Sequence, residues 1–378
     1  MDRKLEKKYE ELAELKKLAG EYYNYEQGIK LMLNSIYGAF GNPYFYFFNV
    51  DIAETITLQG KDAILYTEEL VNKYFREFWH LDTDAHNKMG ITVTGKIKQP
   101  VGIYIDTDSI YMKFEEVIKN SDWEGDSKTF ILNLYKHRLG EYIERILQKY
   151  ADDNNAENFL SFELESIAKN AIWLAKKKYM QNIVWKDPDL HYDDLTKISA
   201  KGFEIIQSST PIFARQKLKD LLKYIFSVEE LSMKDFAGRL KEIKREFKLA
   251  NVENISFAKK VNNYQRYVLN DIDRFEITKG CPIGVRSAGY HNYLLNNSNA
   301  KMKYKPLGNG EKLKMYFSTD RHCDVFAYAP GDYPYEFAPE IDYDVQFEKT
   351  ILDPINRVIK AMGFKPFDRN LIYAVSLF

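Results

Sequence analysis

The feature that most constrains the fold is a pair of aspartates, Asp106 and Asp108, placed between two short runs of β-branched and aromatic residues. Side chains at i and i+2 of an extended chain point the same way about 7 Å apart. The stretch Gly102–Met112 therefore predicts two strands joined by a tight turn through Thr107. Two interpretations stay open. Asp, Thr and Ser favour an exposed hairpin turn, whereas paired carboxylates suit a divalent cation such as Mg²⁺.

The composition sets limits on the class of protein. The chain of 378 residues is long enough for two or three packed regions. Its net charge is −1, so any contact with nucleic acid must depend on local clusters among the 54 Lys and Arg. Cys281 and Cys323 lie far apart, which indicates a reduced compartment and no disulfide framework. With no signal peptide and no run of 18 apolar residues, we expect a cytoplasmic protein without a membrane partner.

Residues 1–40 predict a helical hairpin. The first half carries leucines at helical spacing with charged residues on the other faces, and Gly20 marks a stop before a second helix. In an antiparallel pair that bends near Gly20, Arg3 and Lys7 lie at the height of Asn34. The hairpin would therefore collect side chains from both helices at its open end.

One face of the second helix gathers a cation, an amide and a bare backbone. These residues, with a tyrosine beside them, are Lys30, Asn34, Gly38 and Tyr37. Together with Arg3 and Lys7 they predict a cradle for an anion. A solvated helix face is the alternative, and an Asn-Ser pair in mid-helix before Tyr-Gly argues against it.

A lysine block provides a second charge signal. Five lysines and no acid occur from Lys169 to Lys186. The densest part is the run Lys176, Lys177, Lys178 and Tyr179. Lysines can protect a sheet edge from aggregation, but beside aromatic residues they also suit a track of phosphates. Both interpretations stay open for the block by itself.

A hydroxyl-rich stretch precedes a predicted helix. Ser208, Ser209 and Thr210 stand directly before Pro211, which favours a helix start with a hydroxyl N-cap and proline at the first position. The N-terminus of a helix attracts anions because its amide groups have no partner within the helix. We therefore expect these residues to contact a backbone phosphate.

Three motifs now stand in a fixed order: Lys-x-x-x-Asn-Ser-x-Tyr-Gly from Lys30, Tyr-x-Asp-Thr-Asp-Ser from Tyr104, and Lys-Lys-Lys-Tyr from Lys176. With these motifs the chain resembles the C-terminal part of a family B DNA polymerase, most nearly the replicative polymerases of tailed bacteriophages. The Gly-Phe-Glu that begins at Gly202 and the Ser-Ser-Thr-Pro that follows resemble the thumb of the phage enzymes.

The resemblance implies an α+β fold in three parts. These are helical-hairpin fingers over residues 1–40, a palm with an antiparallel β-sheet and packed helices over 41–200, and a largely helical thumb with a C-terminal tail over 201–378. The implied activity is that of a DNA-directed DNA polymerase that extends a primer 3′-hydroxyl with dNTPs on primer-template DNA. Two Mg²⁺ ions, which Mn²⁺ can replace, would serve as cofactors.

The resemblance also assigns roles to residues. The triphosphate of the incoming dNTP would be held by Arg3, Lys7, Lys30 and Asn34, and the pocket over the nascent base pair would be lined by Tyr37 and Gly38. Asp108 would be the principal metal ligand, with Asp106 in support and Glu165 as a further acid; Asp106, Asp108 and Lys30 form the catalytic set. The DNA would be held by Lys176, Lys177, Lys178, Tyr179, Ser208, Ser209 and Thr210.

Part of the family pattern does not occur in this chain. The Asp-x-x-Ser-Leu-Tyr-Pro-Ser stretch, which supplies the family's other metal-binding aspartate, and the motifs of the proofreading exonuclease are missing. We therefore expect one half of a split polymerase in the cytoplasm of a phage-infected bacterium. An N-terminal subunit would supply the exonuclease, the missing aspartate and the rest of the palm. An engineered fragment is the alternative.

The end of the chain and two other function classes complete the expectations. Ser376-Leu377-Phe378 resembles the start of the peptide that docks phage polymerases on a sliding clamp, and a plain apolar end is the alternative. A second class is a non-catalytic DNA-binding subunit that keeps the fold, and the presence of Asp108, Lys30 and Asn34 together argues against it. A glycosyltransferase with an Asp-x-Asp metal motif would need a nucleotide-binding α/β domain before it, whereas the first 100 residues predict helices.

Overall fold

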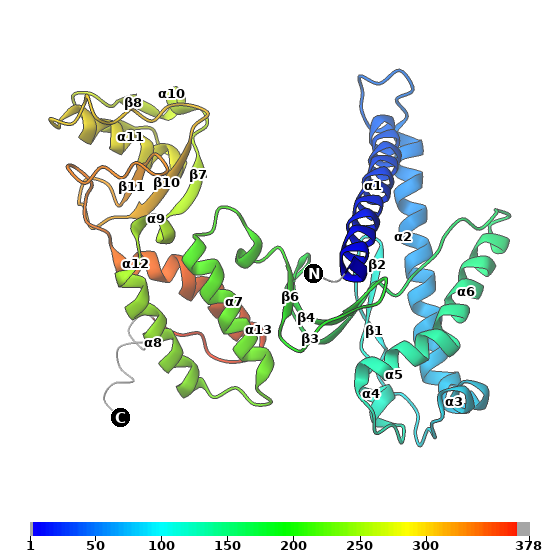
Figure 1. Ribbon diagram of the computed structural model, residues 1–378. Coiled ribbons are helices and arrows are strands. Elements are labelled where there is room, and N and C mark those ends of the chain that lie inside the picture. Colours follow the sequence, from blue (N-terminus) through cyan, green and yellow to red (C-terminus); the bar gives the residue numbers. More distant parts are fainter. Residues whose placement is uncertain (1–2, 369–378) are drawn as a thin grey trace. The chain divides into compact units, whose positions relative to one another are not determined.

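The computed structural model describes residues 3–368 (Figure 1). The chain forms two compact units, which divide between Glu163 and Leu164. None of the helices in the described part combines the length and the apolar character needed to cross a membrane. The residues expected to dock on a clamp, Ser376–Phe378, lie outside the described range.

The first unit is mainly helical. Its helices and strands are, in chain order, α1 (Arg3–Phe40), α2 (Val50–Lys73), α3 (Thr83–Met89), β1 (Gly102–Asp106), β2 (Ser109–Met112), α4 (Glu115–Lys119), α5 (Ser127–Leu134) and α6 (Gly140–Asp153). Side-chain caps begin two of the long helices: Asn49 accepts from the Ile52 amide at α2, and Asp126 accepts from the Thr129 amide at α5.

The core of the first unit lies between the second half of α2 and helices α5 and α6. It is formed by fully buried side chains that include Val71, Phe75, Trp79, Val117, Phe130, Leu134 and Leu147. The hairpin of β1 and β2 lies beside α2 (Figure 1). The buried half of α2 therefore serves as the platform on which this hairpin is mounted.

A partly buried aspartate, Asp82, links two π-helical turns in this unit. Tyr74 belongs to the turn Tyr74–Phe78 that follows α2, and Arg138 belongs to the turn Tyr135–Leu139 between α5 and α6. Asp82 accepts hydrogen bonds from the Tyr74 hydroxyl at 2.7 Å and from the Arg138 guanidinium. Burial alone would raise the pKa of Asp82, but the hydrogen bonds from Tyr74, the Ala85 amide and Arg138 hold it below its ordinary value.

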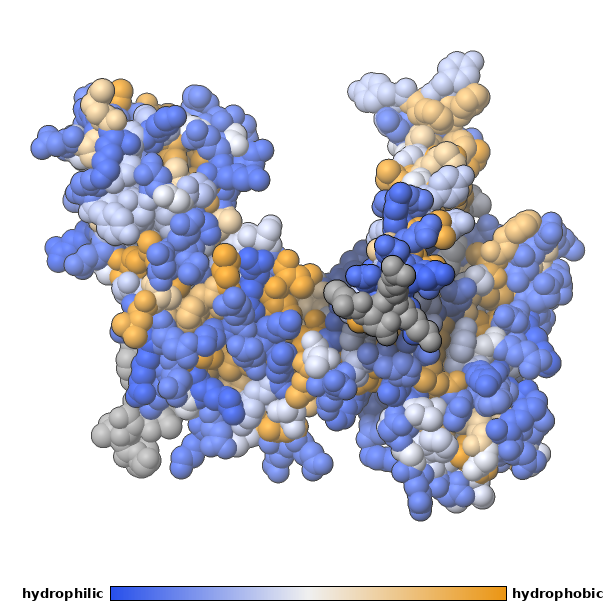
Figure 2. Space-filling view, in the orientation of Figure 1, coloured by the Kyte–Doolittle hydropathy of each residue, from blue (hydrophilic) through white to orange (hydrophobic). Residues whose placement is uncertain are grey.

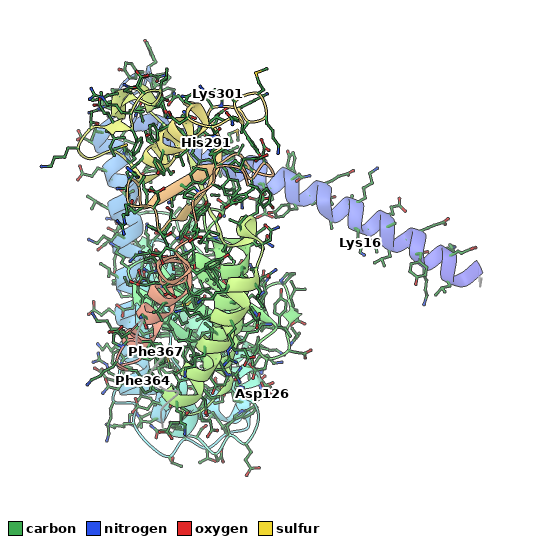
Figure 3. The ribbon with its side chains drawn as sticks, turned by 90° about the vertical axis from the view of Figure 1, so that its left-hand side faces the viewer. Lys16, Asp126, His291, Lys301, Phe364 and Phe367 are labelled. Carbon is green, nitrogen blue, oxygen red and sulfur yellow. The ribbon has the colours of Figure 1, made fainter. Side chains whose placement is uncertain are left out.

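The helical hairpin predicted for residues 1–40 is wrong in this structure. Helix α1 is one helix of 38 residues that passes through Gly20. A glycine inside a helix costs only about 1 kcal/mol relative to alanine, and this one follows a run of strong helix formers from Leu15 to Ala19. Lys7 and Lys30 are therefore about 35 Å apart along the helix axis. Figure 3 shows α1, with Lys16 labelled, extending away from α2.

The junction of α1 and α2 leaves apolar side chains uncovered. The aromatic turn Tyr44–Phe48 contains Tyr44 at 97% exposed and Tyr46 at 91% exposed. Further exposed apolar residues lie on α1 and on the first turns of α2, among them Leu12, Leu15, Leu33, Ile36, Ile52, Ile56 and Leu58. Apolar side chains lie at the surface over this tip (Figure 2). An exposed cluster of apolar side chains is typical of a contact surface.

The second unit combines sheets and helices. Its elements are, in chain order, β3 (Ser166–Ala175), β4 (Lys178–Lys186), β5 (Leu190–His191), β6 (Lys197–Lys201), α7 (Ile212–Ser227), α8 (Met233–Leu249), α9 (Val252–Ile255), β7 (Phe257–Lys260), α10 (Tyr264–Tyr267), β8 (Val268–Asn270), β9 (Glu276–Ile277), α11 (Ile283–Asn296), β10 (Lys312–Phe317), β11 (Val325–Tyr328), α12 (Tyr343–Phe347) and α13 (Asp353–Ala361). Every strand pairing in the described chain is antiparallel.

Two cores hold the second unit together. In the first core, helices α7, α8 and α13 pack with the sheet of β3, β4, β5 and β6 through buried residues such as Leu218, Phe236 and Ile355. In the second, α11 packs on the three-stranded sheet β11–β10–β7 through Tyr290 and Phe326. The α+β class predicted from the sequence is confirmed, and the region after residue 200 contains this sheet in addition to its helices.

Candidate active site and nucleic-acid interface

The two aspartates lie at the tip of the β1–β2 hairpin, as the sequence predicts. Asp106 pairs with Ser109 at the end of the ladder. The Asp108 amide donates to the Asp106 carbonyl at 2.8 Å, and Thr107 between them has φ of 62°. This is a γ-turn of the rare type with positive φ, which is strained for a β-branched residue. Such strain is typical of functional sites.

The two carboxylates have different environments. Asp106 is buried, with only 3% of its surface exposed, whereas Asp108 is exposed. The Thr107 hydroxyl donates to Asp106 Oδ1 at 3.3 Å, and the Ser109 hydroxyl donates to Asp108 Oδ1 at 3.4 Å. The tip therefore presents one carboxylate to solvent and holds the other behind it, an arrangement that suits an outer metal ligand with an inner supporting acid.

The hairpin tip alone does not complete a metal site. Within residues 3–368, no three His, Cys, Asp or Glu side chains gather where they could hold an ion together. Glu165, the further acid expected, belongs to the second unit, where it is exposed and its carboxylate lies 3.9 Å from the Lys186 ammonium. Oxygen ligands from carboxylates are those that Mg²⁺ prefers. Asp106 and Asp108 thus fit a divalent cation chemically, as part of its ligand set.

Helix α1 brings together some of the residues predicted to bind an anion. Lys30, Asn34 and Gly38 follow one another at intervals of four, so that they share one helical face, and all three are exposed, as is Tyr37. A Cβ at Gly38 would meet no atom within 4 Å, so the backbone there is open to a ligand. The continuous helix keeps Lys7 away from this face.

The lysine block forms the turn between β3 and β4. Lys176 and Lys177 connect the strands, and Lys178 begins β4. All three lysines are exposed, whereas Tyr179 is only 5% exposed. Its ring lies 6.3 Å from the Trp173 ring across the strand pair. Tyr179 therefore supports the turn from within, and the lysines form its outer surface.

Gly202 packs directly against this lysine turn. It has φ of +65°, and a Cβ at this position would lie 2.4 Å from the Lys177 carbonyl oxygen. Only glycine combines that conformation with so close an approach. The Lys-Lys-Lys-Tyr and Gly-Phe-Glu motifs are therefore one structural feature. The only sequence signal for this contact was Gly202 itself, which directly follows the end of β6 at Lys201.

Ser209 and Thr210 line a cavity of about 210 Å³ beside the start of α7. Its wall also contains three cations from distant segments: Lys259, Lys349 and Arg357. Lys349 pairs with Asp353 at 2.9 Å, and Arg357 pairs with Glu204. The hydroxyl N-cap predicted at Thr210 is wrong: the N-cap is Pro211, and no side chain caps the helix. Ser208 lies outside the cavity and is exposed.

Sequence comparisons place these features in a known family. The family model for DNA polymerase family B matches residues 3–281, which include all three motifs. The chain is 27% identical over 354 residues to the DNA-directed DNA polymerase of Escherichia phage RB69, covering 86% of this chain and 36% of that polymerase.

Two further relatives are more distant. The polymerase of Enterobacteria phage T4 is 23% identical over 252 residues, covering 63% of this chain and 26% of the phage protein. The DNA polymerase alpha catalytic subunit of Mus musculus is 25% identical over 182 residues, covering 48% of this chain and 9% of the mouse protein. This chain spans little more than a third of the phage proteins at most, and it belongs to DNA polymerase family B.

Proposed function

We propose that this chain carries one side of the nucleotidyl-transfer site of a DNA-directed DNA polymerase. The observation that carries the proposal is the strained turn with Asp106 and Asp108 at its ends, inside the region that matches the family model. The primer 3′-hydroxyl would attack the α-phosphate of a dNTP. A new P–O bond forms, the bond between the α- and β-phosphates breaks, pyrophosphate leaves with the electron pair, and the proton of the hydroxyl passes to solvent water.

Divalent cations would supply the electrostatic part of this chemistry. Two Mg²⁺ ions, which Mn²⁺ can replace, would lower the pKa of the 3′-hydroxyl and neutralise charge on the attacking and leaving oxygens. Asp108 would bind such an ion through its exposed carboxylate, and the buried carboxylate of Asp106 would support it with a second negative charge nearby. Glu165 is a further acid that we assign to the site by family resemblance alone.

The remaining ligands would come from polypeptide outside the described residues. Asp106 and Asp108 can provide one or two carboxylates, and the described chain offers no cluster of three. The uncovered apolar surface around Tyr44–Phe48 also favours contact with another polypeptide. We propose that an N-terminal polymerase segment provides the missing aspartate and the rest of the palm. In a split polymerase this segment would be a separate subunit, which would also carry the exonuclease.

The incoming dNTP would bind at the open face of α1. Lys30 would pair with its phosphates, Asn34 would donate a hydrogen bond, and Tyr37 and Gly38 would lie against the nascent base pair. Arg3 and Lys7 would not contact the same dNTP, because the continuous helix holds their backbone about 35 Å or more from Lys30.

Primer-template DNA would bind through phosphate contacts on the second unit. The exposed lysines of the β3–β4 turn, Lys176–Lys178, would follow one strand, and Tyr179 would support them from below. The cavity with Ser209, Thr210 and Lys259 would hold a backbone phosphate near the start of α7, where amide groups point outward. Ser208 would extend this contact at the surface.

A tagged form of the chain tests the proposal. The protein is recovered through a C-terminal affinity tag from the cells that make it, so that any polypeptide that completes it is recovered too. The native assembly should extend a labelled primer in the presence of Mg²⁺. Asp108→Asn should abolish extension without weakening primer-template binding, whereas Asp84→Asn, at an exposed site on α3, should have no effect. Normal extension by the Asp108→Asn assembly refutes the proposed role.

A further inference from the structure

A buried chain of hydrogen bonds ties the start of β1 to α2. The Gly102 amide donates to Asn72 Oδ1 at 2.9 Å, and Asn72 Nδ2 donates to Glu68 Oε1 at 2.8 Å. Asn72 is 7% exposed and Glu68 lies one helical turn before it. Because a carboxylate can only accept, it fixes which side of the Asn72 amide faces the strand.

The strand changes its pairing register at the same place. Gly102 lies opposite Met112, but Tyr104 lies opposite Tyr111, so that Ile103 is an extra residue in β1. Such a bulge decides which face of the sheet each later residue occupies, and a slip by one residue exchanges the two faces. Without the bulge, Ile105 would therefore take the inward-facing position opposite Ser109 that Asp106 occupies.

Gly102 leaves no room for a side chain. A Cβ there would lie 2.9 Å from both Cγ and Oε1 of Glu68, and 3.2 Å from Asn72 Nδ2. A Cβ here would displace the Glu68 side chain, so only a glycine lets the strand and α2 meet at this point while Glu68 keeps its hydrogen bond with Asn72. The contact between α2 and β1 therefore combines a directional hydrogen bond with a fixed spacing.

We infer that Asn72, oriented by Glu68, is a positioning residue that sets the register of β1 and thereby places Asp106 and Asp108 for the proposed reaction. The inference rests on the proposed function. Asn72 itself touches no reacting atom, because the four residue-to-residue steps from Gly102 to Asp106 span about 13 Å of strand. It acts through the strand, as a fixed point behind the catalytic turn.

Substitutions at Asn72 and Glu68, followed by hydrogen exchange, test the chain of hydrogen bonds. Asn72→Leu leaves the Gly102 amide without an acceptor, so hydrogen exchange in Gly102–Asp106 of the isolated chain should accelerate about 10- to 100-fold. Asn72→Asp alone should also accelerate it, because two carboxylates then face each other. Asn72→Asp combined with Glu68→Gln restores one donor and two acceptors and should restore slow exchange. Asn87→Leu, at an exposed site on α3, is the matched control.

A double-mutant cycle tests the spacing. Gly102→Ala should disturb the strand, because its methyl group meets the Glu68 side chain. The same substitution in a Glu68→Ala background should cause little further change, since the obstructing atoms are gone. Equal effects of Gly102→Ala in both backgrounds, or unchanged exchange in Asn72→Leu, would overturn the inference.

The native assembly distinguishes positioning from simple destabilisation. Asn72→Leu should lower kcat for extension by about 10-fold or more and raise the Mg²⁺ concentration for half-maximal rate, with primer-template affinity unchanged. A variant that only unfolds more often would keep the wild-type Mg²⁺ midpoint, and that result would overturn the positioning role. If the Asp108→Asn assembly extends primers normally, the proposed function fails, while the exchange measurements still decide whether Asn72 fixes the strand.

Discussion

The partly buried pair of Asp82 and Arg138 provides the sharpest stability prediction. Asp82 has a side chain only 8% exposed, and Arg138 is 21% exposed. In Arg138→Met, Asp82 keeps its hydrogen bonds from Tyr74 and the Ala85 amide but loses the charge that balances it. Removing one partner of a fully buried pair costs about 3 to 5 kcal/mol. Because water reaches part of Arg138, we expect a loss of about 3 kcal/mol in the first unit.

The size of this loss should depend on pH. The folded structure lowers the pKa of Asp82 below its ordinary value, so the ionised carboxylate contributes stability above the pKa of an unfolded aspartate, near 4. That contribution disappears as pH falls through the lower folded pKa. The difference between the wild type and Arg138→Met should therefore be full at pH 7 and should shrink below about pH 4.

Native-state hydrogen exchange with mass spectrometry measures the effect locally. The amides of the two π-helical turns, Tyr74–Phe78 and Tyr135–Leu139, report the free energy of opening in the first unit. Arg145→Met serves as the control, because Arg145 and its partner Glu141 have side chains 68% and 54% exposed, and its loss should stay below about 1 kcal/mol. Equal losses in the two variants, or a loss independent of pH, would refute the reasoning.

Two further predictions concern the lysine turn. Gly202→Ala should weaken primer-template binding, because its Cβ would lie 2.4 Å from the Lys177 carbonyl oxygen and push the turn away; an anisotropy titration with unchanged affinity would contradict this. Replacing Lys176, Lys177 and Lys178 by alanine should reduce the slope of log affinity against log salt by about 2 to 3, whereas Lys88→Ala on α3 should leave it unchanged.

Local patterns predicted the turn that carries Asp106 and Asp108. Two short runs of β-branched and aromatic residues with Asp, Thr and Ser between them indicate a two-stranded hairpin within eleven residues, and the hairpin needs no distant partner to be recognised. The same local reasoning failed at Gly20, because a glycine can end a helix or lie inside one at a cost of about 1 kcal/mol. Which outcome occurs depends on what covers the apolar residues on either side, and local sequence does not contain that information.

Long-range contacts explain what the sequence did not predict. The strands β7 and β10 pair across nearly sixty residues, from Phe257 to Met315, so no local pattern indicates their sheet. The cavity beside α7 joins Thr210 to Lys349 for the same reason. Gly202 and Asn72 carry local signals only in hindsight, since a glycine after a strand and an asparagine in a helix have many structural causes.

The most direct test of the account compares the isolated chain with the native assembly. Both are supplied at equal concentration with a labelled primer-template, dNTPs and Mg²⁺, and extension is followed together with DNA binding. If Asp106 and Asp108 form only one side of the site, the isolated chain should bind the primer-template without extending it, whereas the native assembly should do both. Extension by the isolated chain at the rate of the assembly would contradict the account, because the described residues would then contain a complete site.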